Sequence, residues 1–257
     1  MPEENQMSAT IYSVAGSIAT IKLNRPDKRN ALNDELIAGL KKGLRAAAAE
    51  PSVRAVVISG AGKDFCSGAD LSALRKISEA SIAENAADAR SMMDLFTLMR
   101  ELEIPVIAAV RGRALAGGCG LASAADLVLA AESARFGYPE VKIGFVPAMV
   151  MAILKRNVSE KQAFELITRG GEITARRAYE VGLVNQVFAD ETFDSEVQAY
   201  VGVFAEMSRS AVALTKSLLY QIDGMAFREA IETGADVNVI ARLGEDCQQG
   251  IAKFLKK

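Results

Sequence analysis

Two loops rich in glycine and other small residues are the clearest candidates for chemistry in this 257-residue chain. The first covers residues 62–71 (GKDFCSGADL), the second residues 112–122 (GRALAGGCGLA), and each follows an apolar run typical of a buried strand. Small residues where a strand leads into a helix leave backbone N–H groups free to hold a phosphate or a developing oxyanion. The same glycines could instead serve only to let a helix and a strand pack closely.

The second loop does not match a nucleotide-binding P-loop. Gly112 and Gly117 have the spacing of the two glycines in that motif, but Gly118 and Cys119 follow where the motif has Lys and then Ser or Thr. The phosphate cradle and the magnesium ligand are therefore missing, and we exclude nucleotide hydrolysis.

The composition excludes several kinds of catalytic site. The chain has no histidine, so neither a Ser-His-Asp or Cys-His triad nor a His-containing metal site can form. Its three cysteines, Cys66, Cys119 and Cys247, are widely spaced and do not suggest a thiolate metal site. We expect no bound metal, and acid–base chemistry must come from Asp, Glu, Lys, Tyr or Cys.

Charge and hydropathy limit the partners. A net charge of −2 provides no broad positive field for nucleic acid. The longest apolar runs, residues 106–110 and 146–154, are much shorter than the ~20 residues of a membrane-spanning helix. The first nine residues lack the pattern of a signal peptide, and scattered cysteines suit a reducing compartment. We expect a cytoplasmic protein that binds neither nucleic acid nor membrane.

Alternating strands and helices must position the two loops. The pattern predicts a hairpin over 10–14 and 18–23 with a turn at Ala15-Gly16, and a helix that Asn33 caps and that runs to about residue 49. Further predicted elements are apolar strands at 55–59, 106–110 and 127–130 and a polar helix at 82–101. Strands that are apolar throughout and separated by helices imply a parallel sheet covered on both faces.

The last third of the chain has a different pattern. From about residue 160 it is nearly all helical, with Thr174 as a predicted cap. We therefore expect an α/β protein with a core over residues 1–195 and a helical C-terminal region over residues 196–257.

Five motifs together resemble those of the enoyl-CoA hydratase/isomerase (crotonase) family. In chain order they are NRPDKRNAL at 24–32, FCSGADL at 65–71, ALAGGCGL at 114–121, FGYPE at 136–140 and GIAKFLKK at 250–257. Five ordered motifs over nearly the whole chain are far more specific than one glycine loop. The resemblance implies a crotonase-like spiral of ββα turns with a helical C-terminal region that serves oligomerisation and covers the active site. Such proteins usually assemble as homotrimers or dimers of trimers.

The resemblance also implies roles for individual residues. The backbone N–H groups of Ala69 and Gly117 would form an oxyanion hole for the thioester oxygen of an acyl-CoA, and Glu140 would be the catalytic acid/base. Asp27, Lys28 and Arg29 would touch the adenine and phosphates of CoA, and Lys257 would reach CoA from a neighbouring subunit. Further substrate contacts are expected at Ser67, Gly68, Asp70, Leu71, Gly118 and Gly120. No separate cofactor is implied, because CoA is part of the substrate.

These roles suit the residue types. Two preorganised N–H donors stabilise a thioester enolate, and losing one such donor typically costs ~2.7–4 kcal/mol. A carboxyl in an apolar pocket has a raised pKa, which suits proton exchange near neutrality. The side chains that could form this pocket around Glu140 are Phe136, Tyr138, Val141, Ile143 and Phe145. Cys119 has no cationic neighbour in the sequence, so we expect a small packed residue rather than a nucleophile.

The chain departs from the family at Gly120. Hydratases of the family place two glutamates around a water, and the first of them falls at position 120, where this chain has no side chain. One carboxylate is enough for an isomerase. Hydration would need a gap at Gly120 that admits water, with Asp70 or the helix at 82–101 as possible sources of a second carboxylate. A further departure is Pro147-Ala148-Met149, where bulkier residues than in many relatives can reshape the acyl pocket.

Several functions stay open at this point. The first is an enoyl-CoA hydratase/isomerase with Glu140 as its single catalytic glutamate. The alternatives are an enoyl-CoA isomerase only, or a catalytically idle acyl-CoA-binding protein. RNA binding by a crotonase-like protein is least favoured, because the net charge is slightly negative.

Overall fold

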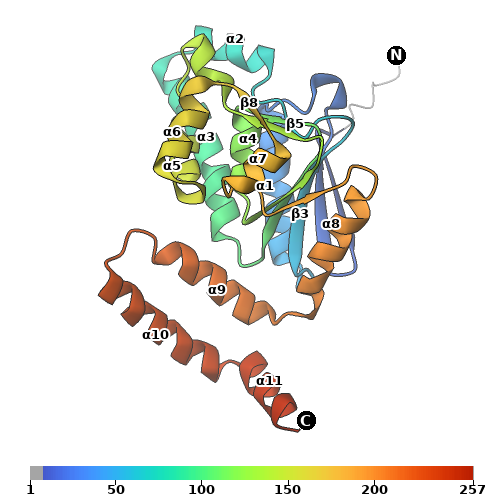
Figure 1. Ribbon diagram of the computed structural model, residues 1–257, viewed down its shortest axis with the longest axis vertical. Helices are drawn as coiled ribbons and strands as arrows, with labels where there is room; N and C mark the ends of the chain where they lie inside the picture. Colours follow the sequence, from blue (N-terminus) through green and yellow to red (C-terminus); the bar gives the residue numbers. More distant parts are fainter. Residues whose placement is uncertain (1–7, 257) are drawn as a thin grey trace.

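The computed structural model describes residues 8–256, apart from the side chains of Leu71, Ala73 and Leu74 (Figure 1). Its centre is a six-stranded sheet in the order β1-β2-β3-β4-β6-β9. The strands are β1 (Thr10–Ala15), β2 (Ile18–Leu23), β3 (Ala55–Gly60), β4 (Val106–Val110), β6 (Leu127–Ala131) and β9 (Gln186–Phe188). β1 and β2 are antiparallel, and every other neighbouring pair is parallel.

Both faces of this sheet are covered, as the uninterrupted apolar strands predict. Alternate residues of a strand point to opposite faces. On one face Val56 and Ile58 pack in a cluster with α1 (Asp34–Ala49) and α3 (Ile82–Glu101). On the other face Ala55 and Val57 pack in a second cluster with α8 (Phe193–Gly202).

The predicted hairpin and helix caps are confirmed. β1 pairs with β2 up to Ala15 and Ile18, so the turn consists of Gly16, which has a φ of +59°, and Ser17, one residue later than the predicted Ala15-Gly16. The side chain of Asn33 accepts a hydrogen bond of 3.0 Å from the N–H of Leu36 at the start of α1. Thr174 caps α7 (Ala175–Glu180) in the same way. Each cap satisfies an N–H that the first turn of a helix leaves free.

A second sheet has three strands in the order β5-β7-β8. They are β5 (Arg113–Leu115), β7 (Arg135–Gly137) and β8 (Glu172–Thr174), with β5 and β7 parallel and β8 antiparallel to β7. β8 and β9 are the exceptions to the predicted, nearly all-helical pattern after residue 160; the other elements described there are helices. Each of the two strands has only three residues, which is too short for an alternating pattern to stand out beside the flanking helices.

The core has further helices. They are η1 (Pro26–Lys28), α2 (Leu71–Glu79), α4 (Gly117–Ser123), η2 (Pro139–Ile143), α5 (Ala148–Asn157), α6 (Glu160–Arg169) and η3 (Val203–Glu206). Of these, α2 and α4 adjoin the two glycine loops, and η3 directly follows α8. α2 begins at the end of the first loop and α4 begins within the second. Both loops therefore lead directly into helices, as their small residues predict.

The C-terminal helices extend away from the core (Figure 1). They are α9 (Arg209–Gln221), α10 (Phe227–Leu243) and α11 (Glu245–Leu255), and α9 lies between α10 and the core. Lys216 anchors α9, because its buried Nζ lies 2.7 Å from Asp126 Oδ2 and donates to the carbonyl of Met99. The domain boundary expected at residue 195 falls inside α8, so the division into two domains stays a prediction.

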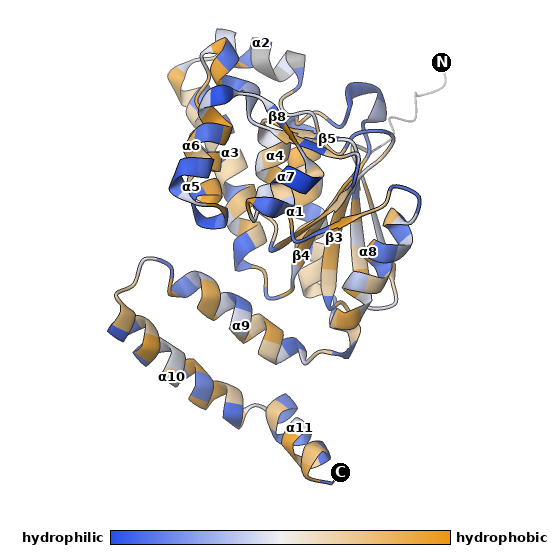
Figure 2. Ribbon diagram, viewed as in Figure 1, coloured by the Kyte–Doolittle hydropathy of each residue, from blue (hydrophilic) through white to orange (hydrophobic). Residues whose placement is uncertain are grey.

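Apolar side chains remain exposed on the helices beyond α9. Figure 2 shows apolar residues along α10 and α11, and Phe227, Leu243 and Phe254 are each about four-fifths exposed. Among the helices of residues 8–256, none is both long and apolar enough to cross a membrane. The exposed apolar residues therefore do not form a spanning segment.

Candidate active site

The two glycine loops lie side by side. Cys66 forms a parallel bridge with Ala114, in which the N–H of Cys66 donates to the carbonyl of Arg113 at 3.0 Å and the N–H of Leu115 donates to the carbonyl of Cys66 at 2.9 Å. Gly68 has a φ of +95°, and a Cβ placed on it would lie 2.7 Å from the Cβ of Ala116. The residues directly before Ala69 and Gly117 are therefore in contact, and only glycine fits at position 68.

The N–H of Ala69 is free to bind a ligand. Ala69 forms a parallel bridge with Leu32: the N–H of Leu32 donates to the carbonyl of Gly68 at 2.7 Å, and the N–H of Asp70 donates to the carbonyl of Leu32 at 3.1 Å. In such a bridge the flanking residues make the hydrogen bonds, so the N–H of Ala69 points away from Leu32. Within residues 8–256 it has no acceptor, and Ala69 itself is exposed.

The N–H of Gly117 is free for a different reason. Gly117 is the first residue of α4, and the first N–H groups of a helix have no intrahelical acceptor. The described part of the chain supplies no other acceptor for it. Ala116 precedes it with a φ of +50°, and its N–H donates to the carbonyl of Gly137 at 2.8 Å. A Cβ on Gly117 would lie 3.0 Å from a methyl of Leu32, so Leu32 adjoins both donors.

The other small residues of the second loop are needed for packing. A Cβ on Gly118 would lie 2.3 Å from the carbonyl oxygen of Cys66, so no larger residue fits between the loops. Cys119 is fully buried, and burial raises the pKa of its thiol to about 12. The prediction that Cys119 is a packed residue is therefore confirmed.

Glu140 follows the strand that runs beside the second loop. β7 is parallel to β5, with Leu115 opposite Gly137, so Gly117 and Glu140 both come just after the ends of paired strands. Among the described residues, Glu140 Oε2 is the only buried side-chain nitrogen or oxygen with no hydrogen-bond partner. Loss of solvent raises the pKa of the Glu140 carboxyl above its usual value.

Only part of the expected apolar pocket surrounds Glu140. Phe136 and Tyr138 are almost completely buried, and the Glu140 charge contributes to raising the pKa of Tyr138, after the larger effect of burial. Val141, Ile143 and Phe145 are exposed instead, with Ile143 at 70%. These three residues lie in or after η2 and do not complete a buried pocket within the described chain.

The space beside Gly120 is filled. A Cβ on Gly120 would lie 2.5 Å from a methyl of Val150 in α5 and 3.5 Å from the ring of Phe96 in α3. The gap that hydration would need at this position is therefore not present. α5 begins within the Pro147-Ala148-Met149 segment, and Val150 lies in its first turn.

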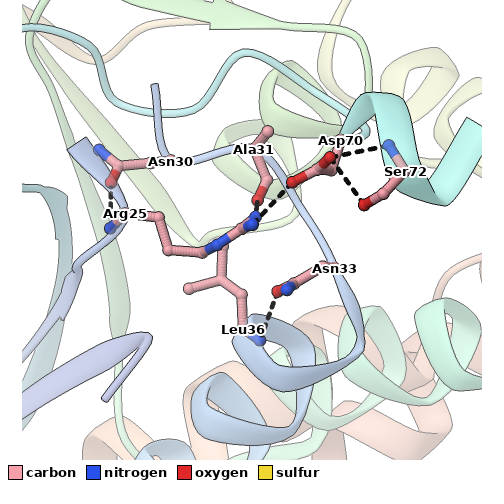
Figure 3. A network of polar contacts seen from close by, with 7 residues as sticks. All are labelled: Arg25, Asn30, Ala31, Asn33, Leu36, Asp70 and Ser72. Carbon is pink, nitrogen blue, oxygen red and sulfur yellow. Dashed lines mark hydrogen bonds and ion pairs between the residues drawn. The ribbon is translucent and has the colours of Figure 1, made fainter. Parts of the chain in front are cut away.

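Asp70 does not supply a replacement acid/base. One carboxylate oxygen accepts hydrogen bonds from the N–H and the hydroxyl of Ser72, so Asp70 caps the start of α2. The other lies 2.6 Å from Arg25 Nη2 (Figure 3). The hydrogen bond from the Ser72 N–H, followed by that from Arg25, lowers the pKa of Asp70 to about 2. Asp70 is thus ionised at neutral pH and has both oxygens engaged within the described chain, so it holds the loop, and its expected contact with substrate stays a prediction.

The loop expected to bind CoA lies next to the segment that contains Ala69, an expected oxyanion donor. Asp27, Lys28 and Arg29 are exposed, and the carbonyl of Arg29 accepts from the N–H of Ser67 at 3.0 Å. Asn30 is fully buried, and its side-chain amide donates to the carbonyls of Ala61 and Asp64. Ser67 itself is half-buried.

For two expected site residues, the structure gives no side-chain position. Leu71 is the first residue of α2, and Lys257 lies outside the described residues. Three residues that sequence reasoning did not single out contribute to the site: Arg25, Leu32 and Val150. Arg25 and Leu32 belong to the first family motif, which was a usable signal. Val150 lies far from Gly120 in the sequence, and no local pattern marks it.

The chain matches the family model described as "Enoyl-CoA hydratase/isomerase" over residues 13–257. A Thermus thermophilus protein, provisionally named an enoyl-CoA hydratase, is 40% identical over 94% of this chain and 96% of its own length. The 2,3-dehydroadipyl-CoA hydratase of Escherichia coli is 35% identical over 98% of this chain and 97% of its own. A crystal structure of an enoyl-CoA hydratase from Mycobacterium smegmatis matches with a TM-score of 0.91 at 32% identity, over 96% of both chains.

Proposed function

The chain belongs to the enoyl-CoA hydratase/isomerase family, and we propose that it stabilises the enolate of an acyl-CoA thioester with Glu140 as its single acid/base. The observation that carries this proposal is the buried Oε2 of Glu140, which has no partner in the described chain. A buried carboxyl oxygen without a hydrogen-bond partner lowers the stability of the folded protein. A carboxylate that must accept a proton from a C–H bond of the substrate needs such a free oxygen, so catalysis accounts for this cost.

The thioester oxygen would bind between the two free N–H groups. As a proton leaves C2, negative charge develops on this oxygen, and the N–H groups of Ala69 and Gly117 stabilise it without any side-chain movement. The exposed loop with Asp27, Lys28 and Arg29 would hold the nucleotide end of CoA. The substrate brings CoA with it, so the reaction needs no separate cofactor.

The filled space beside Gly120 favours proton transfer over water addition. In an isomerase, Glu140 removes a proton from C2 of a 3-enoyl-CoA to give a dienolate, and then returns the proton to C4 to give the 2-enoyl-CoA. One carboxylate serves both steps. A methyl of Val150 lies 2.5 Å from where a Cβ on residue 120 would be, so a second glutamate has no room there. Hydration remains the second candidate, favoured by the relatives named hydratases.

The test is the fate of substrate in D2O. A short 2-enoyl-CoA and its 3-enoyl isomer are incubated with the wild type and with Glu140→Gln, and the products are identified by mass spectrometry. Deuterium incorporation with isomerisation but no added water would establish an isomerase. A 3-hydroxyacyl product that Glu140→Gln loses would establish hydration by a single glutamate. If neither form incorporates deuterium and both bind the thioester equally, the proposal is wrong and the protein only binds acyl-CoA.

The proposal includes a homotrimer or a dimer of trimers in the cytoplasm. The exposed apolar residues of α10 and α11, which the rest of the described chain does not cover, support self-association. The three cysteines, all free in the fold, support a reducing compartment.

A further inference from the structure

The direction of the Ala69 N–H depends on the hydrogen bonds that its neighbours Gly68 and Asp70 make. Ala69 is an exposed residue in the loop between β3 and α2, and its own side chain is one methyl group. Its neighbours Gly68 and Asp70 are both hydrogen-bonded to Leu32, at 2.7 and 3.1 Å. The position of the N–H is therefore set by how the segment that contains Leu32 is held against the segment that contains Asp70.

Arg25 joins these two segments. One arm of its guanidinium donates to the carbonyl of Ala31, directly before Leu32, and the other donates to Asp70 Oδ2 at 2.6 Å (Figure 3). Its backbone N–H donates to Asn30 Oδ1 at 2.9 Å. Because Ala31 and Asp70 lie at opposite ends of the bridge, one side chain spans the pair of hydrogen bonds that frames Ala69.

The ion pair between Arg25 and Asp70 is mostly buried, so its contribution to stability is small. The side chains of Arg25 and Asp70 are 17% and 11% exposed. A buried ion pair is a weak source of stability, since removing both charges from water offsets most of their attraction. The planar guanidinium, with donors at fixed angles, instead contributes geometric precision.

We propose that Arg25 and Asp70 are positioning residues that hold the N–H of Ala69 where the thioester oxygen binds. This inference rests on the proposed function. Arg25 and Asp70 also connect the loop expected to bind CoA with the segment that contains Ala69. CoA binding at Asp27, Lys28 and Arg29 would therefore act on the same segment that fixes the direction of the Ala69 N–H. A displaced donor loses part of its effect on the transition state.

The experiment uses two variants and a matched control in the full-length protein. Asp70→Asn keeps an oxygen for the N–H of Ser72, so α2 retains its cap, but loses the ion pair. Arg25→Lys keeps the charge but lacks the second arm. The control is Asp34→Asn, which removes an exposed ion pair of 2.7 Å between α1 and α2, with Lys76. Exposed pairs of this kind contribute little.

Two readouts separate positioning from folding. The first is kcat and KM with the active enoyl-CoA. The second is the ultraviolet absorbance of the enolate of bound acetoacetyl-CoA, which reports the oxyanion hole without any turnover, with the dissociation constant measured by calorimetry. We expect both variants to lower kcat by about tenfold to a hundredfold, a part of the loss that follows removal of a whole donor. The enolate fraction should fall with kcat, while KM and the dissociation constant change little.

The outcomes are distinct. Coupling between the two residues predicts that Arg25→Lys/Asp70→Asn loses no more than Asp70→Asn alone. Unchanged kcat and enolate absorbance in the variants, or an equal loss in Asp34→Asn, would overturn the positioning role while leaving the proposed function intact. A wild type that binds acetoacetyl-CoA but forms no enolate would overturn both. Should Asp70→Asn unfold, Arg25→Lys alone decides the matter by the same readouts.

Discussion

At the scale of single residues, the candidate site contains two carboxylates in opposite environments. Asp70 has partners for both oxygens, and its pKa is lowered to about 2. Glu140 has one buried oxygen without a partner, and loss of solvent raises its pKa. Two carboxyls whose environments move their pKa values apart have different roles: Asp70 stays charged and structural, whereas Glu140 can gain and lose a proton.

The raised pKa of Glu140 predicts a stability effect with a definite sign. The folded protein binds the Glu140 proton more tightly than the unfolded chain, so ionisation costs stability as the pH rises through the folded pKa. Glu140→Gln removes this cost. We expect it to raise the melting temperature at pH 7 by about 2–4 °C, the shift that about 1 kcal/mol produces in a chain of this size.

The measurement is a series of melting curves from pH 4 to pH 8. The advantage of Glu140→Gln should disappear toward the acid end, where Glu140 is protonated in both states. Glu196→Gln, at an exposed position without an ion pair in the described chain, serves as the control and should show no such trend. An advantage that stays the same at every pH would contradict the assignment of a raised pKa to Glu140.

At the scale of elements, α5 packs against α4 at the position where the family's first glutamate is expected. Val150 of α5 fills the position beside Gly120 of α4. A glutamate there would have to displace a branched side chain, and overpacking of this kind typically costs ~1–3 kcal/mol. We therefore expect Gly120→Glu alone to lower stability by this amount and to gain no hydratase activity.

Making room should reverse this result. In Gly120→Glu/Val150→Ala the offending methyl is absent, and the Cβ of residue 150 lies 3.7 Å from the Cβ position of residue 120, an ordinary contact. The double variant should be more stable than the sum of the two single changes predicts, and should form more 3-hydroxyacyl product from a 2-enoyl-CoA. Denaturant melts and product analysis check both points, with Val150→Ala alone as the control. A stable Gly120→Glu would show that Val150 does not restrict the position.

At the scale of the whole molecule, the helices beyond α9 have apolar residues that the described chain leaves uncovered. Phe227 and Leu243 lie at the two ends of α10 and are 83% and 78% exposed. Large exposed apolar patches mark interaction sites. If a neighbouring subunit covers this surface, Phe227→Glu and Leu243→Glu should shift the protein from a trimer or hexamer toward the monomer.

Light scattering after size exclusion measures this shift. Arg228→Gln changes a neighbouring side chain that is already polar and 90% exposed, and should leave the assembly unchanged. A wild type that is monomeric, or variants that assemble as the wild type does, would count against an interface on α10.

The amino-acid sequence by itself determined the elements whose signals are local. The apolar runs predicted β3, β4 and β6, and side-chain caps marked the starts of α1 and α7. These predictions succeeded because strand burial, helix periodicity and capping depend on residues close together in the chain. The ordered motifs likewise identified Ala69, Gly117 and Glu140 as candidates, and their roles stay predictions.

Only the tertiary structure decided how distant residues meet. Val150 packs against Gly120, and Arg25 is hydrogen-bonded to both Ala31 and Asp70. Gly120 and Val150, like Arg25 and Asp70, are far apart in the chain and meet only in the fold. β8 and β9 are strands only because they pair with β7 and β6. A three-residue segment has too little pattern of its own, so its structure comes from the hydrogen bonds of the strand beside it. For the same reason the sequence did not show whether there is a gap beside Gly120, whereas the fold shows that Val150 fills it.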